Sequence, residues 1–282
     1  MTSVSPPTEY LQNQKFIAFD TETTGLWAPA HRLVEIAAVK FRLADDNADT
    51  FQSLINPQRP IPADVTGIHG ITDEMVADAP TVRSVLKQFI EFCGDDAILI
   101  AHNAPFDISF LSCELDRVGL IFPHNLILDT VDIYHRLYPE LESYSLLALV
   151  TIFDIAKTQE HRALEDAHLV RRLFIKAIER FGSIGSLEEF KSLFTTATLA
   201  DWPGLVKELP TEFGELNRAL KDNLRVEITY QPESKPAHNR VIRPKQVCFL
   251  GSTFYIYAYC ERARAERTFR LDRIETFRVL DN

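Results

Sequence analysis

The segment FDTETTG, residues 19–25, constrains this chain more than any other, because an apolar stretch ends there in two carboxylates. FIAFD (16–20) is typical of a buried strand. Side chains alternate across a strand, so Asp20 and Glu22 point to the same side, roughly 7 Å apart along the chain. Two like charges at that spacing repel each other. Either they extend into water, as isolated Asp-x-Glu pairs usually do, or a positive group holds them together.

The hydrophobic pattern predicts an α/β domain over residues 14–182, with a mixed five-stranded sheet flanked by helices. Strands are expected at 16–20, 32–41, 49–56, 97–102 and 125–130, and helices at 80–93, 105–119, 143–153 and 165–182. The proline-rich stretch 56–65 is predicted to be loop. Gly119 and Gly182 are expected to end the helices that precede them.

The remaining segments differ in character from this domain. Residues 1–13 are predicted to be a flexible leader, and 183–221 a weakly patterned helical linker interrupted by Pro and Gly. Residues 222–282 contain short alternating strands separated by turn signals, which predicts a small all-β domain. The segment 222–282 carries 11 Lys/Arg against 8 Asp/Glu, although the whole chain has a net charge of −10. This asymmetry indicates two domains with different partners.

Composition excludes several classes of protein. The apolar runs are far shorter than the ~20 residues that cross a bilayer, and the N-terminus lacks the basic and apolar blocks of a signal peptide. The four cysteines show no C-x-x-C spacing, which argues against a disulfide framework or a zinc site. We therefore expect a cytoplasmic protein without membrane association, whose acidic charge is unsuited to coating duplex DNA.

Two more segments supply partners for the paired carboxylates. HNAPFD (102–107) places Asp107 about one turn into a helix that follows a buried strand. HRALED (161–166) places Asp166 at the start of the last long helix, with His161 five residues earlier. Because five helical positions rotate about 140°, His161 fits better in the preceding loop than on the helix. A mobile histidine beside a fixed aspartate suits a general base, although a single histidine is more often a cap or a surface residue.

Asp20, Glu22, Asp107 and Asp166 are then expected to meet at one end of the sheet. Ligation by oxygen alone favours Mg²⁺ or Mn²⁺ over zinc. Two such ions about 4 Å apart stabilise the attacking and leaving oxygens of a phosphoryl displacement. Two cations would also neutralise the repulsion between the carboxylates of FDTETTG.

The motifs D-x-E-T-T-G, H-N-A-x-F-D and H-x₄-D, in this order, resemble those of the DEDDh or DnaQ-like 3′–5′ exonucleases. The GIHGIT stretch (67–72) is also similar to that family. The resemblance implies an RNase H-like fold and hydrolysis of the terminal phosphodiester at a 3′ end, releasing nucleoside monophosphates. It further implies that the four acids hold the metals and that His161 accepts the proton of the attacking water.

The same resemblance implies a pocket for the terminal nucleotide. It would be shaped by Thr23, Gly25 and Leu26, with His69 and Phe106 nearby. His102 and Asn103 have two interpretations, as substrate contacts or as hydrogen-bonding groups within a loop. Asp129, although acidic and close to this region, is predicted to cap a helix rather than bind metal.

The last sixty residues resemble a WYL domain, a small Sm-like β-barrel found in bacterial regulators and some nucleic-acid enzymes. The segments that carry the resemblance are ITY (228–230), NRVIRP (239–244), FYIYAYC (254–260) and RTFRLDRI (267–274). The resemblance implies binding of a nucleotide or single-stranded nucleic acid. The residues expected to bind that ligand are Arg240, Tyr255, Arg267, Arg270 and Arg273. In the alternative interpretation the arginines pair with Glu266, Asp272 and Glu275 and complete a small polar core.

The sequence thus predicts a 3′–5′ exonuclease that uses two Mg²⁺ or Mn²⁺ ions. The expected substrate is single-stranded DNA or a frayed 3′ end, with RNA left open, and a polymerase or DNA-repair partner is considered. Two alternatives remain: a nucleic-acid or nucleotide sensor with little catalysis, and a proofreading subunit docked to a polymerase through 183–221.

Overall fold

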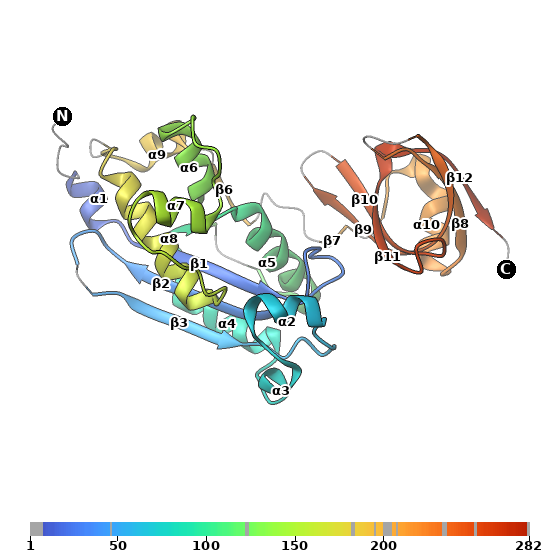
Figure 1. The fold of residues 1–282 in the computed structure, drawn as a ribbon, viewed down its shortest axis with the longest axis horizontal. Helices are drawn as coiled ribbons and strands as arrows, with labels where there is room; N and C mark the ends of the chain where they lie inside the picture. Colours follow the sequence, from blue (N-terminus) through green and yellow to red (C-terminus); the bar gives the residue numbers. More distant parts are fainter. Residues whose placement is uncertain are drawn as a thin grey trace. The chain divides into compact units, whose positions relative to one another are not determined.

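The computed structural model describes residues 8–45, 47–121, 124–181, 184–194, 196–199, 205–206, 208–232, 236–250 and 253–280. The chain forms two compact units, Met1–Trp202 and Pro203–Asn282, and each is described by itself (Figure 1). None of the helices in the described ranges is long and apolar enough to span a membrane.

The first unit is an α/β domain built on a mixed sheet. Its strands are β1 (Phe16–Thr23), β2 (Leu33–Phe41), β3 (Asp49–Leu54), β4 (Ile98–Ala101), β5 (Ile127–Asp129) and β6 (Thr196–Ala197). They lie in the order β3-β2-β1-β4-β5-β6. β1 pairs antiparallel with β2 and parallel with β4, and β4 pairs parallel with β5. This is the RNase H-like arrangement that was predicted, with the two-residue β6 added at one edge.

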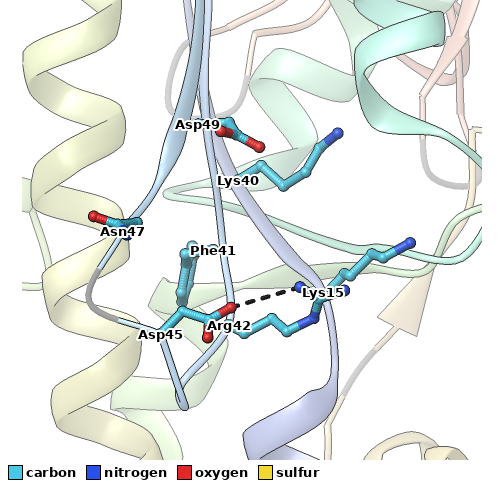
Figure 2. Close-up of a pocket in the computed structure, with 7 residues that line it drawn as sticks. All are labelled: Lys15, Lys40, Phe41, Arg42, Asp45, Asn47 and Asp49. Atoms are coloured by element: carbon cyan, nitrogen blue, oxygen red, sulfur yellow. Dashed lines mark ion pairs between the residues drawn. The ribbon is translucent and has the colours of Figure 1, made fainter.

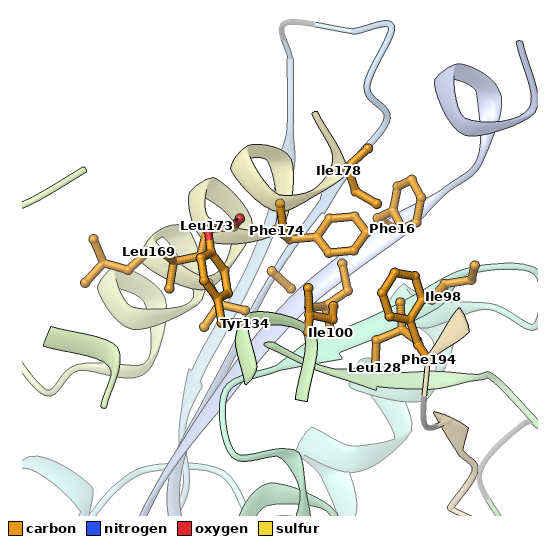
Figure 3. Packing of buried hydrophobic residues seen from close by; sticks show 14 of the residues in the cluster. Phe16, Ile98, Ile100, Leu128, Tyr134, Leu169, Leu173, Phe174, Ile178 and Phe194 are labelled. Atoms are coloured by element: carbon orange, nitrogen blue, oxygen red, sulfur yellow. Dashed lines mark hydrogen bonds between the residues drawn. The ribbon is translucent and has the colours of Figure 1, made fainter. Parts of the chain in front are cut away.

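The helices of this unit are α1 (Glu9–Asn13), α2 (Ala63–His69), α3 (Asp73–Val76), α4 (Val82–Cys93), α5 (Ala104–Val118), α6 (Thr130–Leu137), α7 (Leu146–Ile152), α8 (Ala163–Ile178) and α9 (Leu187–Leu193). α8 packs across β1 and β2 together with α6 and α7, where Phe16 and Phe174 meet in the core (Figure 3). α4 covers the opposite face, where Phe89 packs against Phe19. Residues of even number in β1 therefore face α8, and those of odd number face α4.

Several local predictions differ from the structure. Residues 9–13 of the expected leader form α1, because Thr8 caps this helix and Leu11 is buried in the core. The predicted loop 56–65 already contains the start of α2 at Ala63. α8 ends at Ile178, and its predicted end at Gly182 lies outside the described residues. The expected linker 183–221 is divided between the two units and contains β6.

The second unit is a curved antiparallel sheet packed on one helix. Its elements are β7 (Leu205–Val206), a 3₁₀ turn at Thr211–Phe213, α10 (Gly214–Lys221), β8 (Arg225–Tyr230), β9 (His238–Leu250), β10 (Thr253–Cys260), β11 (Ala265–Arg270), a second 3₁₀ turn at Leu271–Arg273, and β12 (Ile274–Leu280). The strand order is β11-β10-β9-β8-β12, and β7 pairs with β9. Leu216 and Ala219 of α10 are buried against the apolar face of this sheet. The all-β domain expected from the sequence is present. Its last part is formed by β11 and β12, with the 3₁₀ turn Leu271–Arg273 between them.

Candidate active site

Strand β1 places the paired carboxylates on the face covered by α8. Asp20 and Glu22 share the parity of Phe16 and Ala18, which belong to the core beneath α8. Both side chains are partly exposed at the end of the strand. The sequence prediction that the two acids point to one side is therefore correct.

Helix α8 brings Asp166 to the same place. Carboxylate oxygens of Asp20, Glu22 and Asp166 lie within 4.8 Å of one another. Asp166 is only 3% exposed, and its Oδ2 accepts a hydrogen bond of 2.6 Å from Nε2 of Gln159. His161 lies in the loop before α8, as predicted, and is exposed with a positive φ of 51°. Its charge lowers the pKa of Asp166, as expected of a neighbour.

Asp107 is held on the other side of β1. It lies in the first turn of α5 and is 2% exposed, and its Oδ1 accepts a hydrogen bond of 2.6 Å from Oγ1 of Thr21. Asp107 lies outside the group of three within 4.8 Å, but its charge acts on both Asp20 and Glu22. The structure thus brings all four predicted acids to one end of β1.

The cluster is electrostatically unfavourable without a cation. Burial raises the pKa of Asp20 well above its usual range, and the charges of Asp107 and Glu22 raise it further. Burial, followed by the charges of Asp166 and Glu35, raises the pKa of Glu22 to about 8. Burial raises the pKa of Asp107 to about 7 although the hydrogen bond from Thr21 opposes this change. Burial also raises the pKa of Asp166.

These residues fit a hard divalent cation. All the side chains that converge here offer carboxylate oxygens, the ligands that Mg²⁺ and Mn²⁺ prefer. Among the described residues, nothing hydrogen-bonds the buried Oδ1 of Asp166. A buried acceptor without a partner, in a group of acids with raised pKa values, fits ligation of a divalent cation.

The loop after β1 is held by local contacts. Thr23 donates from Oγ1 to the carbonyl of Gly25 at 2.7 Å, and Leu26 is 84% exposed. Gly25 has φ +153°, and a Cβ there would lie 2.4 Å from the His31 ring, so only glycine fits. Thr24 contacts the same ring, its Oγ1 lying 3.2 Å from Nδ1. His31 therefore supports this loop, although no motif in the sequence indicates it.

The two other predicted pocket residues, His69 and Phe106, come from α2 and α5. His69 is 2% exposed, its Nδ1 accepts from the backbone N–H of Ile71 at 3.0 Å, and its Nε2 lies 3.3 Å from the carbonyl of Thr23. His69 thus ties α2 to the end of β1. Phe106 is half-buried at the start of α5 and packs on Phe110, with ring centroids 5.0 Å apart.

His102 and Asn103 take part in the loop between β4 and α5. Nδ1 of His102 lies 2.8 Å from Oγ1 of Thr130, and burial lowers the pKa of His102 to about 4. Asn103 caps α5 in a left-handed conformation, and its N–H donates to Oδ1 of Asp129 at 2.9 Å. Asp129 also caps α6 by accepting from the N–H of Val131, as predicted. These contacts favour the interpretation of His102 and Asn103 as loop residues.

A buried ion pair lies beside the cluster and was not predicted from the sequence. Glu35 of β2 is fully buried and accepts hydrogen bonds from Arg162, the residue between His161 and α8. A carboxylate in the middle of the apolar strand LVEIAAVKF was the available signal.

The arginines of the second unit are divided between two faces of the sheet. Arg240 and Arg267 line a cavity of about 290 Å³ together with Tyr230, Pro232, His238, Thr268 and Phe269. Arg240 donates from Nε to His238 at 2.8 Å and lies 5.9 Å from the Phe269 ring. Because Arg267 and Arg270 are three positions apart in β11, they point to opposite faces.

Arg270 has a partner two residues away in the sequence. It makes two hydrogen bonds to Asp272, of 3.0 and 2.8 Å, and lies 5.9 Å above the Tyr255 ring. Arg273 lies in the 3₁₀ turn Leu271–Arg273, between β11 and β12. Pairing of Arg270 with Asp272 agrees with the alternative in which these arginines are structural.

Another cavity, of about 410 Å³, lies at the opposite end of β1 and β2 (Figure 2). Its lining residues are Lys15, Lys40, Phe41, Arg42, Asp45, Asn47 and Asp49. Two of its cations have acidic partners, since Arg42 lies 3.5 Å from Asp45 and Lys15 lies 2.5 Å from Asp96. The cavity contains none of the predicted site residues.

The fold and the acidic cluster define the first unit as an RNase H-like nuclease domain. Residues 17–174 match the family model described as exonuclease, and this chain belongs to that family. Residues 211–279 match the model of the WYL domain. Both matches confirm the families predicted from the sequence motifs.

Curated relatives agree with this assignment. The chain is 40% identical over 181 residues to a DNA polymerase III PolC-type protein of Caldanaerobacter subterraneus subsp. tengcongensis, a match that covers 64% of this chain and 13% of the relative. It is 39% identical over 170 residues to the PolC-type protein of Bacillus subtilis, covering 60% and 12%. The chain thus spans about an eighth of the length of these relatives.

A solved 3′-exonuclease structure shares the fold. This structure concerns 3′-end specific recognition of histone mRNA stem-loop by a 3′-exonuclease. The identity is 18% and the TM-score is 0.55, and the match covers 62% of this chain and 85% of that one. Exonuclease X in complex with 5′ overhanging duplex DNA has 30% identity and a TM-score of 0.47, covering 61% and 94%.

Proposed function

We propose that this chain is a metal-dependent 3′–5′ exonuclease that removes nucleoside 5′-monophosphates from single-stranded DNA or frayed 3′ ends. The observation that carries the proposal is the convergence of Asp20, Glu22 and Asp166 within 4.8 Å, with the buried Asp107 beside them. This convergence occurs in a chain of the exonuclease family.

Asp20, Glu22, Asp107 and Asp166 would hold two Mg²⁺ or Mn²⁺ ions. Bound divalent cations polarise the scissile phosphate and lower the pKa of water. The raised pKa values of these acids follow from burial and then from the charges of their neighbours, and bound cations would favour the ionised acids.

In the proposed reaction an imidazole nitrogen of His161 accepts a proton from the attacking water. The water oxygen bonds to phosphorus, the P–O3′ bond breaks, and the leaving 3′ oxygen takes a proton. Asp166 lies near enough to His161 for their charges to interact, and so it would stabilise the imidazolium that forms. The exposed loop position of His161 gives it access to water.

The terminal nucleotide would lie against the exposed Leu26, with Phe106 on the side of α5. Apolar contacts of this kind tolerate any base, because every base presents a π-face. The loop 23–26 offers backbone groups and an apolar side chain rather than a set of base-specific donors. We therefore expect little sequence preference.

A digestion experiment tests the proposal. A 3′-labelled and a 5′-labelled oligonucleotide are incubated with the protein in Mg²⁺, in Mn²⁺ and in EDTA, across single-stranded, duplex, DNA and RNA substrates. We expect the wild-type protein to release mononucleotides from the 3′ end only when metal is present. The Asp20→Asn variant should release none. Release in EDTA, or by pure Asp20→Asn, would contradict the mechanism.

For the second unit we propose binding of a nucleotide or single-stranded nucleic acid at the cavity that holds Arg240 and Arg267. Two guanidinium groups beside Tyr230 and Phe269 combine phosphate-binding forks with aromatic rings. In this way the unit would raise the local concentration of substrate for the catalytic domain.

Two other functions remain to be distinguished. A sensor with little catalysis conflicts with the intact set of four acids and His161, and the digestion experiment separates it. A proofreading role is suggested by the PolC-type relatives, which are polymerases, although the match covers about an eighth of their length. Co-purification of a polymerase with the tagged chain would support that role over a stand-alone function in repair.

A further inference from the structure

A fifth carboxylate lies next to the four predicted ones. Glu35 of β2 is the register partner of Glu22 of β1, so the two side chains share one face of the sheet. Glu35 is 0% exposed. Its charge raises the pKa of Glu22, which shows that the two carboxylates are electrostatically close.

Four hydrogen bonds satisfy Glu35 from three directions. Arg162 donates from Nε to Oε2 at 3.0 Å and from Nη2 to Oε1 at 2.7 Å, which is a bidentate pair. The N–H of Ala163 donates to Oε2 at 3.1 Å, and Nε2 of Gln52 donates to Oε1 at 3.0 Å. Burial favours the protonated acid, but the hydrogen bonds have the larger combined effect and keep the pKa of Glu35 below its usual value. Glu35 is thus anionic and fully occupied, and it is not available to a metal.

Arg162, the partner of Glu35, lies in the chain between His161 and Asp166. Arg162 follows His161 directly and is the N-cap residue of α8. Its carbonyl accepts from the N–H of Asp166 at 2.9 Å, in the first turn of that helix. The bond from Ala163 to Glu35 also satisfies one of the N–H groups that a helix start leaves unpaired. The pair therefore attaches the first turn of α8 to the strand beside Glu22.

We propose that Glu35 and Arg162 are positioning residues that fix the first turn of α8 on β2, and thereby set Asp166 and His161 against Asp20 and Glu22. The inference rests on the proposed function of the acidic cluster. A buried ion pair contributes little net stability compared with an apolar pair, so its value here is geometric. Arg162 has a second effect, because its positive charge lowers the pKa of Glu22.

The test compares Glu35→Gln, Arg162→Gln, Arg162→Lys and the double variant Glu35→Gln/Arg162→Gln. Mn²⁺ affinity is measured by calorimetry on the full chain, kcat and KM on a single-stranded oligonucleotide, and hydrogen exchange over residues 159–166. Glu261→Gln serves as the matched control. It alters another bidentate pair, Glu261 with Arg225 at 2.9 Å, which lies in the second unit.

We expect each single Gln variant to lose about 10- to 100-fold in Mn²⁺ affinity and in kcat, with KM changed less than threefold. Exchange over 159–166 should become faster. Arg162→Lys keeps the charge but loses the bidentate geometry, so it should recover part of the loss. The double variant should be no worse than the worse single one, because neither charge is left buried alone. Glu261→Gln should lower only thermal stability.

The inference fails if the folded single variants bind Mn²⁺ and turn over within twofold of the wild type, or if the losses of the two variants multiply in the double variant. The proposed function fails differently, because then the wild-type chain itself shows no Mn²⁺-dependent digestion.

Discussion

Thr21 donates a hydrogen bond of 2.6 Å from Oγ1 to Oδ1 of Asp107, and both residues are buried. Thr21 lies between Asp20 and Glu22 on β1 but points to the opposite face. The bond therefore links Asp107, on α5, to the strand that carries the other acids. It also lowers the pKa of Asp107, which burial raises to about 7.

Replacing Thr21 with Val should shift metal binding to higher pH. Valine has nearly the shape of threonine but cannot donate, so the pKa of Asp107 would rise further. A metal must then compete with a proton over a wider pH range. Calorimetric titration with Mn²⁺ from about pH 6 to pH 9 measures the midpoint. Thr130→Val is the control and should leave the midpoint in place. Thr130 is another buried threonine, and its hydroxyl contacts His102 and the carbonyl of Ala101.

The metal-free protein should lose stability as the pH rises from about 4.5 to about 8. The pKa of Glu22 is raised from its usual value to about 8, so the folded state holds a proton that the unfolded state releases. Stability from that group is complete below the unfolded pKa and is lost as the pH rises through the folded one. After allowance for partial exposure we expect a loss of about 1–2 kcal/mol.

Thermal unfolding in EDTA across that range measures this loss, and Mn²⁺ should restore stability most at the alkaline end. Glu22→Gln should flatten the pH dependence. A melting temperature in EDTA that rises steadily towards pH 8 would contradict the electrostatic account.

The site residues that the sequence predicts lie at the ends of strands or the starts of helices. Asp20, Asp107 and Asp166 each belong to a strand or helix whose hydrophobic periodicity is visible in the sequence. The expected topology of the sheet then brings these three acids together. The loop position of His161 followed from its spacing to Asp166 and from helix geometry. The exonuclease and WYL matches agree with those motifs.

The unpredicted parts depend on contacts between segments far apart in the chain. Glu35 and Arg162 are 127 positions apart, and neither the strand nor the loop shows the pairing by itself. Likewise, β6 and β7 have two residues each, too few for periodicity to reveal. The register of Thr21 against α5 and the 3₁₀ turn that separates Arg273 from β11 are also tertiary features.

Replacing His161 with Asn should lower kcat by about 10²- to 10⁴-fold while KM and stability change little. Asparagine tolerates the positive φ of this position, so the loop keeps its conformation. Single-turnover digestion measures the chemical step directly. His124→Asn, at another exposed histidine, should retain full activity. Equal rates for His161→Asn and the wild type would exclude His161 as the base.

Replacing Leu26 with Ala should raise KM for single-stranded DNA about five- to tenfold, since the lost apolar contact with the terminal nucleotide is about 1 kcal/mol. Leu26 is 84% exposed, so the melting temperature should not change. Ile121→Ala is the control, because Ile121 is 89% exposed and precedes β5, away from the site. If both variants raise KM equally, Leu26 has no specific role.

The second unit offers a test in which two arginines of one strand should behave differently. Arg267 shares a cavity with Arg240, whereas Arg270 is bonded twice to Asp272 on the other face. Arg267→Ala should weaken binding of a labelled single-stranded oligonucleotide about tenfold, or ~1.4 kcal/mol, and make the affinity less dependent on salt. Arg270→Ala should have a smaller effect on binding and a larger one on stability, because it leaves Asp272 without its two bonds.

The binding measurement requires the full chain with Asp20→Asn, so that the oligonucleotide is not digested. Anisotropy at several salt concentrations gives both the affinity and its salt dependence. Arg278→Ala is the matched control, because Arg278 is an exposed arginine of β12 that is paired with Glu227. Equal effects of Arg267→Ala and Arg278→Ala would mean that only general positive charge attracts the oligonucleotide. The cavity of Arg240 and Arg267 would then not be its binding site.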